Sequence, residues 1–367
     1  MASLETHGYR GANAATGRLW RERLDDLRLV RRTVIESPLA AIPAVTGNRV
    51  LIKYEPAQEI RSFKIRGATY AMASDLDNLR ERGVVADSGG NHSQAVALAG
   101  RELGVPVHII MAAVVPENKV AATRSFGATD GSFELDTTPG SFVAAKEKAK
   151  NVATEQGKRY LSPYDDADIV RGTATLVPEI VHQLEASGRQ SPHAVHVPVG
   201  GGGLISGIAD VNHEQGRLFE LYGYGITGAD SAARSLRAVR EHGAMEPVPV
   251  PGEVNRDAEG LAVKCIGNEA FRRIRDGKID DIFTVESLGE VGVAYRWYRH
   301  NAMPALGVDT SSEAAVWDAM PEVSSMVAVA GMLRHLRESG ARDQAHVVII
   351  SGSNTDRESF QHAVDAA

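Results

Sequence analysis

Residues 194–204 read AVHVPVGGGGL, an apolar run that ends in four consecutive glycines. A short β-branched run of this kind is typical of a strand buried on both faces of a parallel sheet. Glycine loses more backbone entropy on ordering than any other residue, which argues against a simple turn. We therefore predict a strand, a glycine loop and a helix, an arrangement that suits a bound phosphate. The loop is neither the usual G-x-G-x-x-G nor a P-loop, because no Gly-Lys-Ser/Thr follows.

The rest of the chain alternates between short apolar runs and longer amphipathic segments. Strands are predicted at residues 49–54, 83–87, 105–111, 194–199, 222–228 and 346–350, and helices at 91–103, 117–126, 141–156 and 176–185. Leucine and valine at near-helical spacing (Leu19, Leu24, Leu27, Val30) predict a helix within the first forty residues. Strands that alternate with helices indicate an α/β fold with parallel sheets.

The composition restricts the class of protein. The chain has 367 residues, of which 43% are hydrophobic and 24% charged, as in an ordinary globular protein. Its net charge of −7 gives no basic surface for nucleic acid or an acidic membrane. No run of about 18 apolar residues and no apolar leader are present, so we expect a cytoplasmic protein without a membrane partner. The single cysteine, Cys265, is expected to be a buried thiol.

Residues 62–68 read SFKIRGA, which puts Lys64 between Phe63 and Ile65. A lysine at the edge of a buried element loses hydration, which disfavours the ammonium and exposes a nucleophilic amine. Taken alone, such a residue is more often a surface lysine whose stem covers apolar neighbours. Lys64 is nevertheless the candidate for an amine that forms an imine.

Two further polar loops follow predicted strands. Residues 88–94 read SGGNHSQ, and N–H groups with short polar side chains at a helix start suit a carboxylate, although Asn91 as a simple helix cap is the alternative. Residues 351–354 read SGSN and place Ser351 at the carboxyl end of a strand, where α/β sheets bind ligands. A reactive lysine, an anion loop, a phosphate loop and a polar strand end together describe a site for pyridoxal phosphate (PLP).

These motifs resemble, in order along the chain, those of the fold-type II pyridoxal-phosphate enzymes, in particular the serine/threonine dehydratase (ammonia-lyase) branch. His92 after Asn91 favours this branch over cysteine synthases. The resemblance implies an α/β fold of two open, twisted, mostly parallel sheets, like the β subunit of tryptophan synthase. The large PLP-binding domain would comprise residues 1–70 and 165–367, and the small domain residues 71–164.

The resemblance also implies a role for each motif residue. Lys64 would hold PLP and then act as the base at the substrate Cα. The cofactor-binding residues would be Phe63, Lys64, Asn91, Gly200, Gly201, Gly202, Gly203, Leu204 and Ser351, and the substrate carboxylate would meet Ser88, Asn91 and His92. A serine at the pyridine nitrogen makes the ring a weaker electron sink than a carboxylate would, which favours loss of a β-substituent over transamination. We therefore expect a homodimeric lyase that converts L-threonine or L-serine to a 2-oxo acid and ammonia.

The chain departs from the family pattern at several positions. Residues 172–175 read GTAT, and residues 309–313 fit the family's Glu-Pro-Ala-Gly pattern poorly. Arg61 and Arg171 are either solvated surface arginines or would recognise an anionic substrate side chain, such as that of 3-hydroxyaspartate. Gly89 stands where related racemases carry a serine, which disfavours racemisation.

A metal site is not expected, because Asp230 is the only carboxylate in residues 228–234 and a hard cation needs several oxygen ligands. The remaining acidic residues, Glu55 among them, are expected to face solvent or cap helices.

The sequence is also compatible with three other functions. A PLP-dependent β-replacement synthase, or another amino-acid lyase, is the nearest alternative. A dinucleotide-binding oxidoreductase would account for the glycine loops, but no acidic residue follows about 20 positions beyond the loop. A non-catalytic nucleotide-binding α/β protein would account for the departures from the family pattern.

Overall fold

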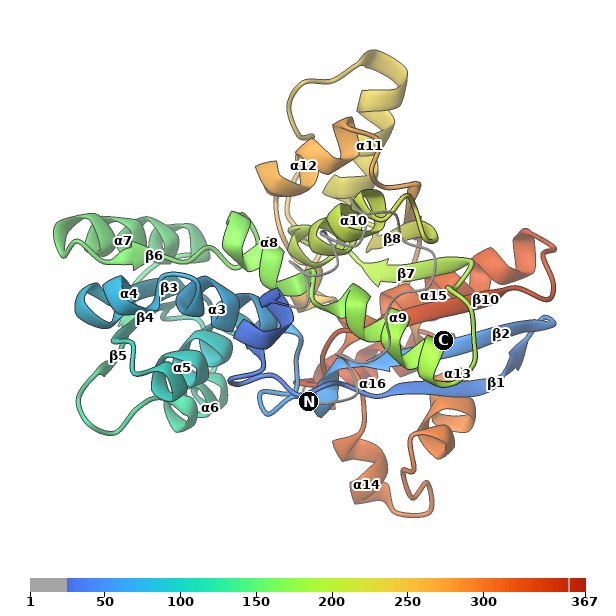
Figure 1. The fold of residues 1–367 in the computed structure, drawn as a ribbon, viewed down its shortest axis with the longest axis horizontal. Helices are drawn as coiled ribbons and strands as arrows, with labels where there is room; N and C mark the ends of the chain where they lie inside the picture. Colours follow the sequence, from blue (N-terminus) through green and yellow to red (C-terminus); the bar gives the residue numbers. More distant parts are fainter. Residues whose placement is uncertain (1–24, 356) are drawn as a thin grey trace.

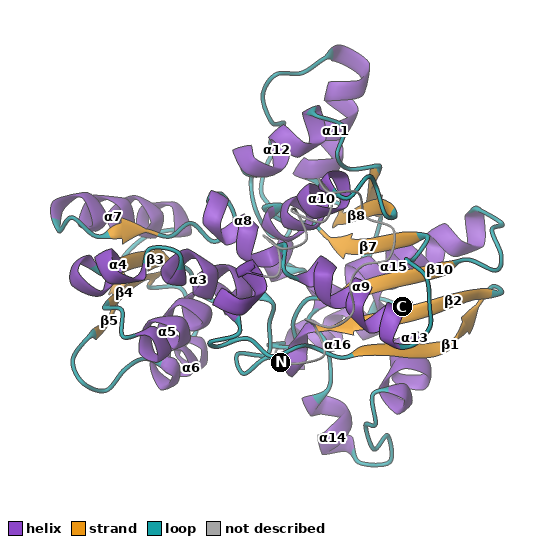
Figure 2. Cartoon of the chain, viewed as in Figure 1, coloured by secondary structure: helices purple, strands orange, loops and turns teal. Residues whose placement is uncertain are grey.

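The computed structural model describes residues 25–355 and 357–367, which form two β-sheets surrounded by helices (Figures 1 and 2). The larger sheet has six strands in the order β1-β2-β10-β7-β8-β9. Its strands are β1 (Leu39–Val45), β2 (Asn48–Tyr54), β7 (Ala194–Pro198), β8 (Glu220–Ile226), β9 (Asp281–Val285) and β10 (Ala345–Ile350). Only β1, which pairs with β2, runs antiparallel to its neighbour.

The smaller sheet lies on the other side of the molecule and has four parallel strands in the order β5-β4-β3-β6. They are β3 (Val84–Asp87), β4 (Val107–Ala112), β5 (Phe133–Thr138) and β6 (Arg159–Tyr160). Two open, mostly parallel sheets confirm the predicted α/β fold.

Helices connect and cover these strands. They are α3 (Lys64–Ala73), α4 (Leu76–Arg82), α5 (Asn91–Leu103), α6 (Glu117–Phe126), α7 (Phe142–Glu155), α8 (Ala167–Thr173), α9 (Leu176–Ala186), α10 (Gly203–Glu214), α11 (Ser231–His242), α12 (Asn268–Arg275), α13 (Leu288–Ala305), α14 (Glu313–Asp318), α15 (Val323–Glu338) and α16 (Arg357–Asp365), with 3-10 turns η1 (Glu55–Ala57) and η2 (Glu259–Leu261). In the part of the chain that the structure describes, no helix has the length and apolar character to cross a membrane.

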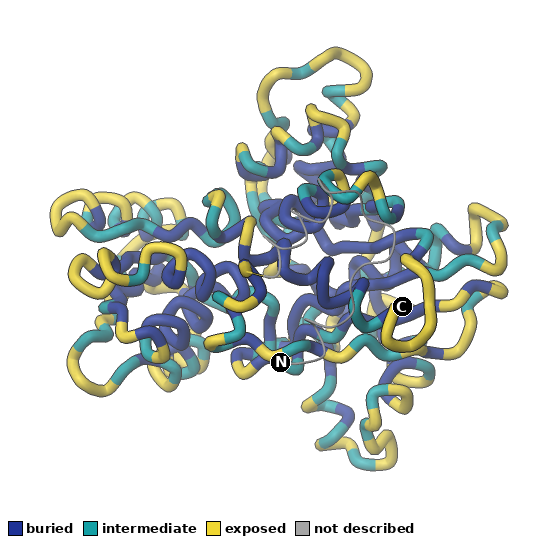
Figure 3. The backbone as a smooth tube through the Cα atoms, in the orientation of Figure 1, coloured by how far each residue is buried: buried dark blue, intermediate teal, exposed yellow. Residues whose placement is uncertain are grey.

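Both faces of the central strands of the larger sheet are buried, as the dark blue centre of the molecule in Figure 3 shows. Alternate residues of β10 point to opposite faces. Val347 and Ile349 pack with α9 and α10 in one cluster, whereas Val348 and Ile350 pack with α13 and α15 in another. Burial on both faces explains why this strand reads as an uninterrupted apolar run.

Helix α3 joins the smaller sheet's core. Its residues Ile65 and Met72 belong to the same cluster as Val84 and Ile109 of the small sheet, and α3 packs against α5 and α8. The strands of the larger sheet come from residues 39–54 and 194–350, and those of the smaller sheet come from residues 84–160. The predicted domain limits at residues 70 and 165 stay a prediction.

The predicted N-terminal helix is present at residues 25–30, where Leu27 and Val30 are buried. Leu19 and Leu24 lie outside the described residues. Cys265 is half-buried, so the prediction of a buried thiol was too strong.

Candidate active site

Hydrogen bonds bring the lysine motif, the strand-end serine and the asparagine loop together. The Phe63 N–H donates to the Ser351 carbonyl at 3.0 Å, directly before α3 begins. The Asn354 side chain donates to Oδ1 of Asn91, the first residue of α5, at 2.7 Å. Three segments that are far apart in the sequence therefore meet at one point between the two sheets.

Lys64 is the first residue of α3 and is half-buried. Its Nζ donates to the Pro163 carbonyl at 2.6 Å and lies 5.2 Å from the centroid of the Phe63 ring. Loss of hydration lowers the pKa of Lys64 from 10.5 to about 8, although the Glu322 carboxylate opposes this shift. The amine is therefore neutral in a useful fraction of molecules near neutral pH, as a nucleophile requires.

The four glycines form the turn between β7 and α10, and Gly202 has a φ of 89°. The N–H groups of residues 200–204 donate no hydrogen bond to another part of the described chain. Unpaired N–H groups at a helix N-terminus suit a phosphate. A Cβ on Gly201 would lie 2.2 Å from the Tyr164 ring, and one on Gly202 would lie 2.3 Å from Ala270. Glycine is therefore also required at these two positions because neighbouring residues of the protein leave no room for a side chain.

Pro163 and Tyr164 link the lysine to the glycine loop. The Pro163 carbonyl accepts from Lys64, and the Tyr164 backbone lies 3.1 Å from where a Cβ on Gly203 would be. Burial raises the pKa of Tyr164 to about 12, so its hydroxyl stays protonated. One short segment thus sets the relative position of the amine and the N–H groups.

The first turn of α5, which follows β3, holds a fully buried histidine. Nε2 of His92 lies 3.1 Å from the Leu161 carbonyl, so it carries the proton and Nδ1 is an acceptor. Nδ1 is buried without a hydrogen-bond partner among the described residues. Burial and the neighbouring Lys64 lower the pKa of His92 to about 3, so the ring is neutral.

Ser88 and Gly89, in the loop between β3 and α5, concern the predictions about carboxylate binding and racemisation. The Ser88 hydroxyl accepts from the Gly90 N–H at 3.2 Å. A Cβ on Gly89 would lie 2.5 Å from Cγ2 of Val115, so a serine at this position would require Val115 to move.

Glu322, which the sequence did not single out, lies at the centre of the site. Its Oε1 accepts from the Asn91 side chain at 2.7 Å and from the Asn354 N–H at 3.1 Å, and its Oε2 accepts from the Ser324 hydroxyl at 3.0 Å. The family's Glu-Pro-Ala-Gly pattern was compared with residues 309–313, which fit it poorly and are largely exposed. The feature of the sequence that could have indicated Glu322 is its position directly before α15, a helix that begins with small and apolar residues.

Arg61 and Arg171, for which the sequence allowed either a surface position or contact with an anionic substrate, are both paired with carboxylates of the protein. Arg61 donates to Asp318 at 2.8 Å and to the Ser353 hydroxyl at 3.0 Å. Arg171 donates to Asp26 at 3.0 Å. These pairs already balance both charges, which counts against recognition of an anionic substrate side chain.

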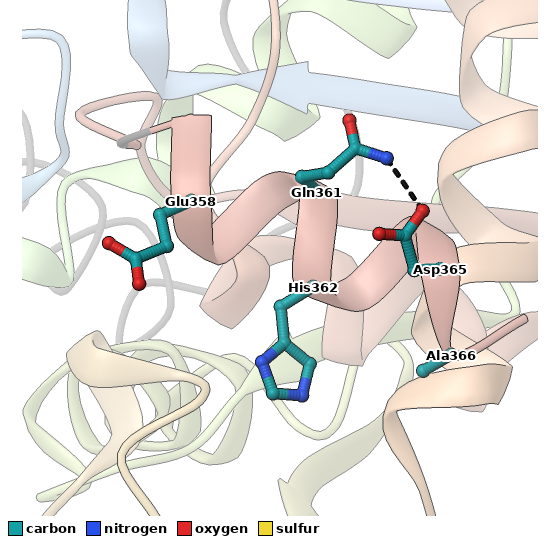
Figure 4. Close-up of a pocket in the computed structure, with 5 residues that line it drawn as sticks. All are labelled: Glu358, Gln361, His362, Asp365 and Ala366. Carbon is teal, nitrogen blue, oxygen red and sulfur yellow. Dashed lines mark hydrogen bonds between the residues drawn. The ribbon is translucent and has the colours of Figure 1, made fainter.

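Two observations concern other kinds of site. Among the described residues, no group of three or more His, Cys, Asp or Glu side chains is arranged to hold a metal ion. A surface hollow along α16 shares no residue with the site; it is lined by Glu358, Gln361, His362, Asp365 and Ala366 (Figure 4).

The residues brought together here fit a phosphate-bearing aldehyde. The glycine turn offers unpaired N–H groups, the lysine offers an amine of lowered pKa, and His92 offers a buried nitrogen without a partner.

Known proteins are similar to this chain in sequence and in fold. The L-threonine dehydratase biosynthetic IlvA of Salmonella typhimurium is 33% identical over 309 residues, which are 84% of this chain and 54% of that protein. The threonine dehydratase of Nicotiana attenuata is 32% identical over 336 residues, 91% of this chain and 50% of that protein. The chain thus spans about half the length of the curated relatives it matches.

Among solved structures, the processed form of threonine deaminase isoform 2 from Solanum lycopersicum superposes with a TM-score of 0.78 at 28% identity. That match covers 97% of this chain and 95% of the other. Serine racemase from Dictyostelium discoideum, at 23% identity and a TM-score of 0.75, shares the fold and covers 92% of this chain and 98% of that chain. The family model for pyridoxal-phosphate dependent enzymes matches residues 30–302. With the family pattern over most of its length and a site that fits the cofactor, the chain belongs to the pyridoxal-phosphate dependent enzymes.

Proposed function

We propose that this protein catalyses β-elimination from L-threonine or L-serine and releases a 2-oxo acid and ammonia. The observation that carries the proposal is the Lys64 amine, which is desolvated, has a pKa of about 8 and lies among the polar loops of the site. The similarity to threonine dehydratases over most of this chain supports this activity.

Each loop would hold one part of the cofactor. The N–H groups of residues 200–204 would bind its phosphate, Lys64 its aldehyde carbon and Ser351 its ring nitrogen, with Phe63 beside the ring. PLP, when bound, supplies an electron sink for negative charge that develops at the substrate Cα. The amide of Asn91 donates one N–H to Glu322 and retains a second for the ring hydroxyl.

The substrate carboxylate would bind at the start of α5. The Ser88 hydroxyl accepts from Gly90, so its own proton is available for a carboxylate oxygen. The first N–H groups of a helix have no partner within it, and those of Asn91 and His92 would serve the same carboxylate. The His92 side chain presents an acceptor at Nδ1, so it does not donate to the carboxylate.

Lys64 would then take the proton from Cα. At pH 7, an amine with a pKa near 8 is neutral in roughly a tenth of the molecules, against far fewer for an ordinary lysine. Glu322 accepts a hydrogen bond from Asn91, and its charge raises the pKa of Lys64. It therefore adjusts the basicity of Lys64 by its charge, because no hydrogen bond between the two side chains is found among the described residues.

The test is product formation by the PLP-loaded enzyme. We expect 2-oxo acid and ammonia from L-threonine or L-serine, and a loss of roughly 10²–10⁴-fold in kcat for Lys64→Ala. Replacing the exposed Lys150 by alanine is the control and should leave kcat unchanged. Thioether formation from serine and a thiol in place of oxo acid would indicate β-replacement and contradict the proposal.

We also propose that the enzyme is a cytoplasmic homodimer. The mass in solution tests the dimer, and a monomer at assay concentration would contradict it.

A further inference from the structure

A second serine is buried against the residue proposed to meet the pyridine nitrogen. Ser325, in the first turn of α15, is fully buried, and its Oγ lies 3.0 Å from Oγ of Ser351. The same oxygen is 3.1 Å from the N–H nitrogens of Ser351 and Gly352 and 3.0 Å from the Gly352 carbonyl. Ser325 therefore contacts every polar group of Ser351 and Gly352 except the Ser351 carbonyl, which accepts from Phe63.

Counting donors and acceptors fixes the direction of these bonds. A hydroxyl has one proton and two lone pairs. The N–H groups of Ser351 and Gly352 can only donate, so together they occupy both lone pairs of Ser325. Ser325 must then donate its proton, either to the Gly352 carbonyl or to the Ser351 oxygen. In neither case can Ser351 donate to Ser325.

The alternative arrangement is costly. If Ser351 donated to Ser325, one of the two N–H groups would lose its acceptor in a buried position. An unsatisfied buried donor costs roughly 1–3 kcal/mol, more than a single serine hydrogen bond returns.

We propose that Ser325 is a positioning residue that forces the Ser351 hydroxyl to present its proton to the pyridine nitrogen of the cofactor. This inference rests on the proposed function, because it needs PLP at this site. It adds that the donor role of Ser351 is set by its neighbour; a ring nitrogen that accepts this proton carries none of its own.

A double-mutant cycle on the dissociation constant of PLP tests the proposal without any substrate. Ser325→Ala and Ser351→Ala should each weaken PLP binding roughly two- to tenfold, the effect of one hydrogen bond. If Ser325 acts through Ser351, the double variant binds PLP no more weakly than Ser351→Ala alone. Effects that multiply in the double variant would overturn the proposal.

Ser324→Ala is the matched control. Ser324 is the adjacent hydroxyl in the same helical turn, but it donates to Glu322 and not to Ser351. Its effect on PLP binding should combine independently with that of Ser351→Ala. Coupling as strong as that of Ser325 would show that any change in this turn disturbs Ser351.

A measurement on the unaltered holoenzyme covers the case in which Ser325→Ala does not fold. With PLP labelled with ¹⁵N in the ring, the nitrogen resonance should have the chemical shift of a hydrogen-bonded, unprotonated pyridine. A pyridinium shift would refute the role of Ser325. If the unaltered protein binds no PLP at all, the proposed function itself fails, so the two failures are distinguishable.

Discussion

The amine of Lys64 combines a buried position with a nearby carboxylate, and these two influences oppose each other. Burial lowers its pKa from 10.5 to about 8, whereas Glu322 raises it. Only the neutral amine attacks an aldehyde. We therefore expect the rate of PLP capture by the apoprotein to rise about tenfold per pH unit up to pH 8 and then to level off.

The same measurement on Glu322→Gln isolates the carboxylate. Removing its charge should move the midpoint of the pH profile below 8, because the influence that raised the pKa of Lys64 is gone. Glu313→Gln, at the exposed first position of α14, should leave the midpoint at about 8. Equal midpoints for Glu322→Gln and the unaltered protein would contradict this account, and the absorbance change on mixing follows the reaction.

The sequence singled out individual polar side chains as candidates but not their partners. Lys64 stood out because apolar residues flank it, and Asn91 and Ser351 because they follow predicted strands. Glu322 was missed because one glutamate before a helix is a weak signal in a chain with 47 acidic residues. The Tyr164 ring that crowds Gly201 was also not foreseeable, since only the folded chain brings the two together.

At the scale of the elements, four buried charges connect β2, α3, α9 and η1. Lys53 and Arg66 face Glu55 and Glu179, with N–O distances of 2.8–2.9 Å, and all four side chains are fully buried. The prediction that Glu55 faces solvent or caps a helix was wrong, because Arg66, 11 residues away, provides its counter-charge inside the protein. Arg66 follows Lys64 by two residues, so this network also anchors the first turn of α3.

Breaking this network should destabilise the protein strongly. Glu179→Gln leaves two buried cations facing one anion, and we expect a loss of roughly 3–5 kcal/mol in the free energy of unfolding. The cations lower the pKa of Glu179 to about 2, so the carboxylate is ionised at neutral pH. Glu185→Gln, exposed on the same helix, should change the free energy by less than about 0.5 kcal/mol. Urea unfolding of both variants decides the matter, and equal losses would count against the network.

The pattern of hydrophobic residues predicted the central strands and the long helices. Helices α5 and α6 have the bounds that the sequence predicted, and β2, β3, β4, β7, β8 and β10 lie within about three residues of the prediction. The missed strands have weaker patterns: β5 reads FELDTT and is half-exposed, β1 contains a proline, and β6 has only two residues. These strands, like β9, owe their existence to pairing with a neighbour, which a local pattern does not record.

At the scale of the whole molecule, a cluster of histidines lies within the larger sheet. Nε2 of His196 on β7 is 3.0 Å from Nδ1 of His346 on β10, and Nδ1 of His196 is 2.8 Å from the Tyr224 hydroxyl. Burial and neighbouring histidines lower the pKa of His346 to about 4 and that of His196 well below its usual value. Both rings are therefore neutral in the folded protein.

This cluster makes the fold sensitive to mild acid. Histidines in the unfolded chain take up protons below pH 6.5, whereas these two remain neutral, so the free energy of unfolding should fall from pH 6.5 toward pH 4. The slope is at most about 1.4 kcal/mol per pH unit for each histidine. His346→Asn should reduce the slope, and His300→Asn, at an exposed position, should not. Urea midpoints that are equal at pH 7.5 and pH 5.5 would contradict this prediction.

The arrangement of two sheets was predictable only through the family resemblance. Periodicity alone indicated parallel strands and helices, but it could not assign the strands to two separate sheets or place β1 antiparallel at an edge. Strand order depends on contacts between distant segments, such as β10 between β2 and β7.

The central claim is that Lys64 is the residue that binds the cofactor covalently, and chemical reduction tests it most directly. The PLP-loaded protein is treated with borohydride, digested and mapped by mass spectrometry. We predict a single modified peptide in which Lys64 carries the reduced cofactor. An adduct on a different lysine, or none on a protein that has bound PLP, would contradict the account.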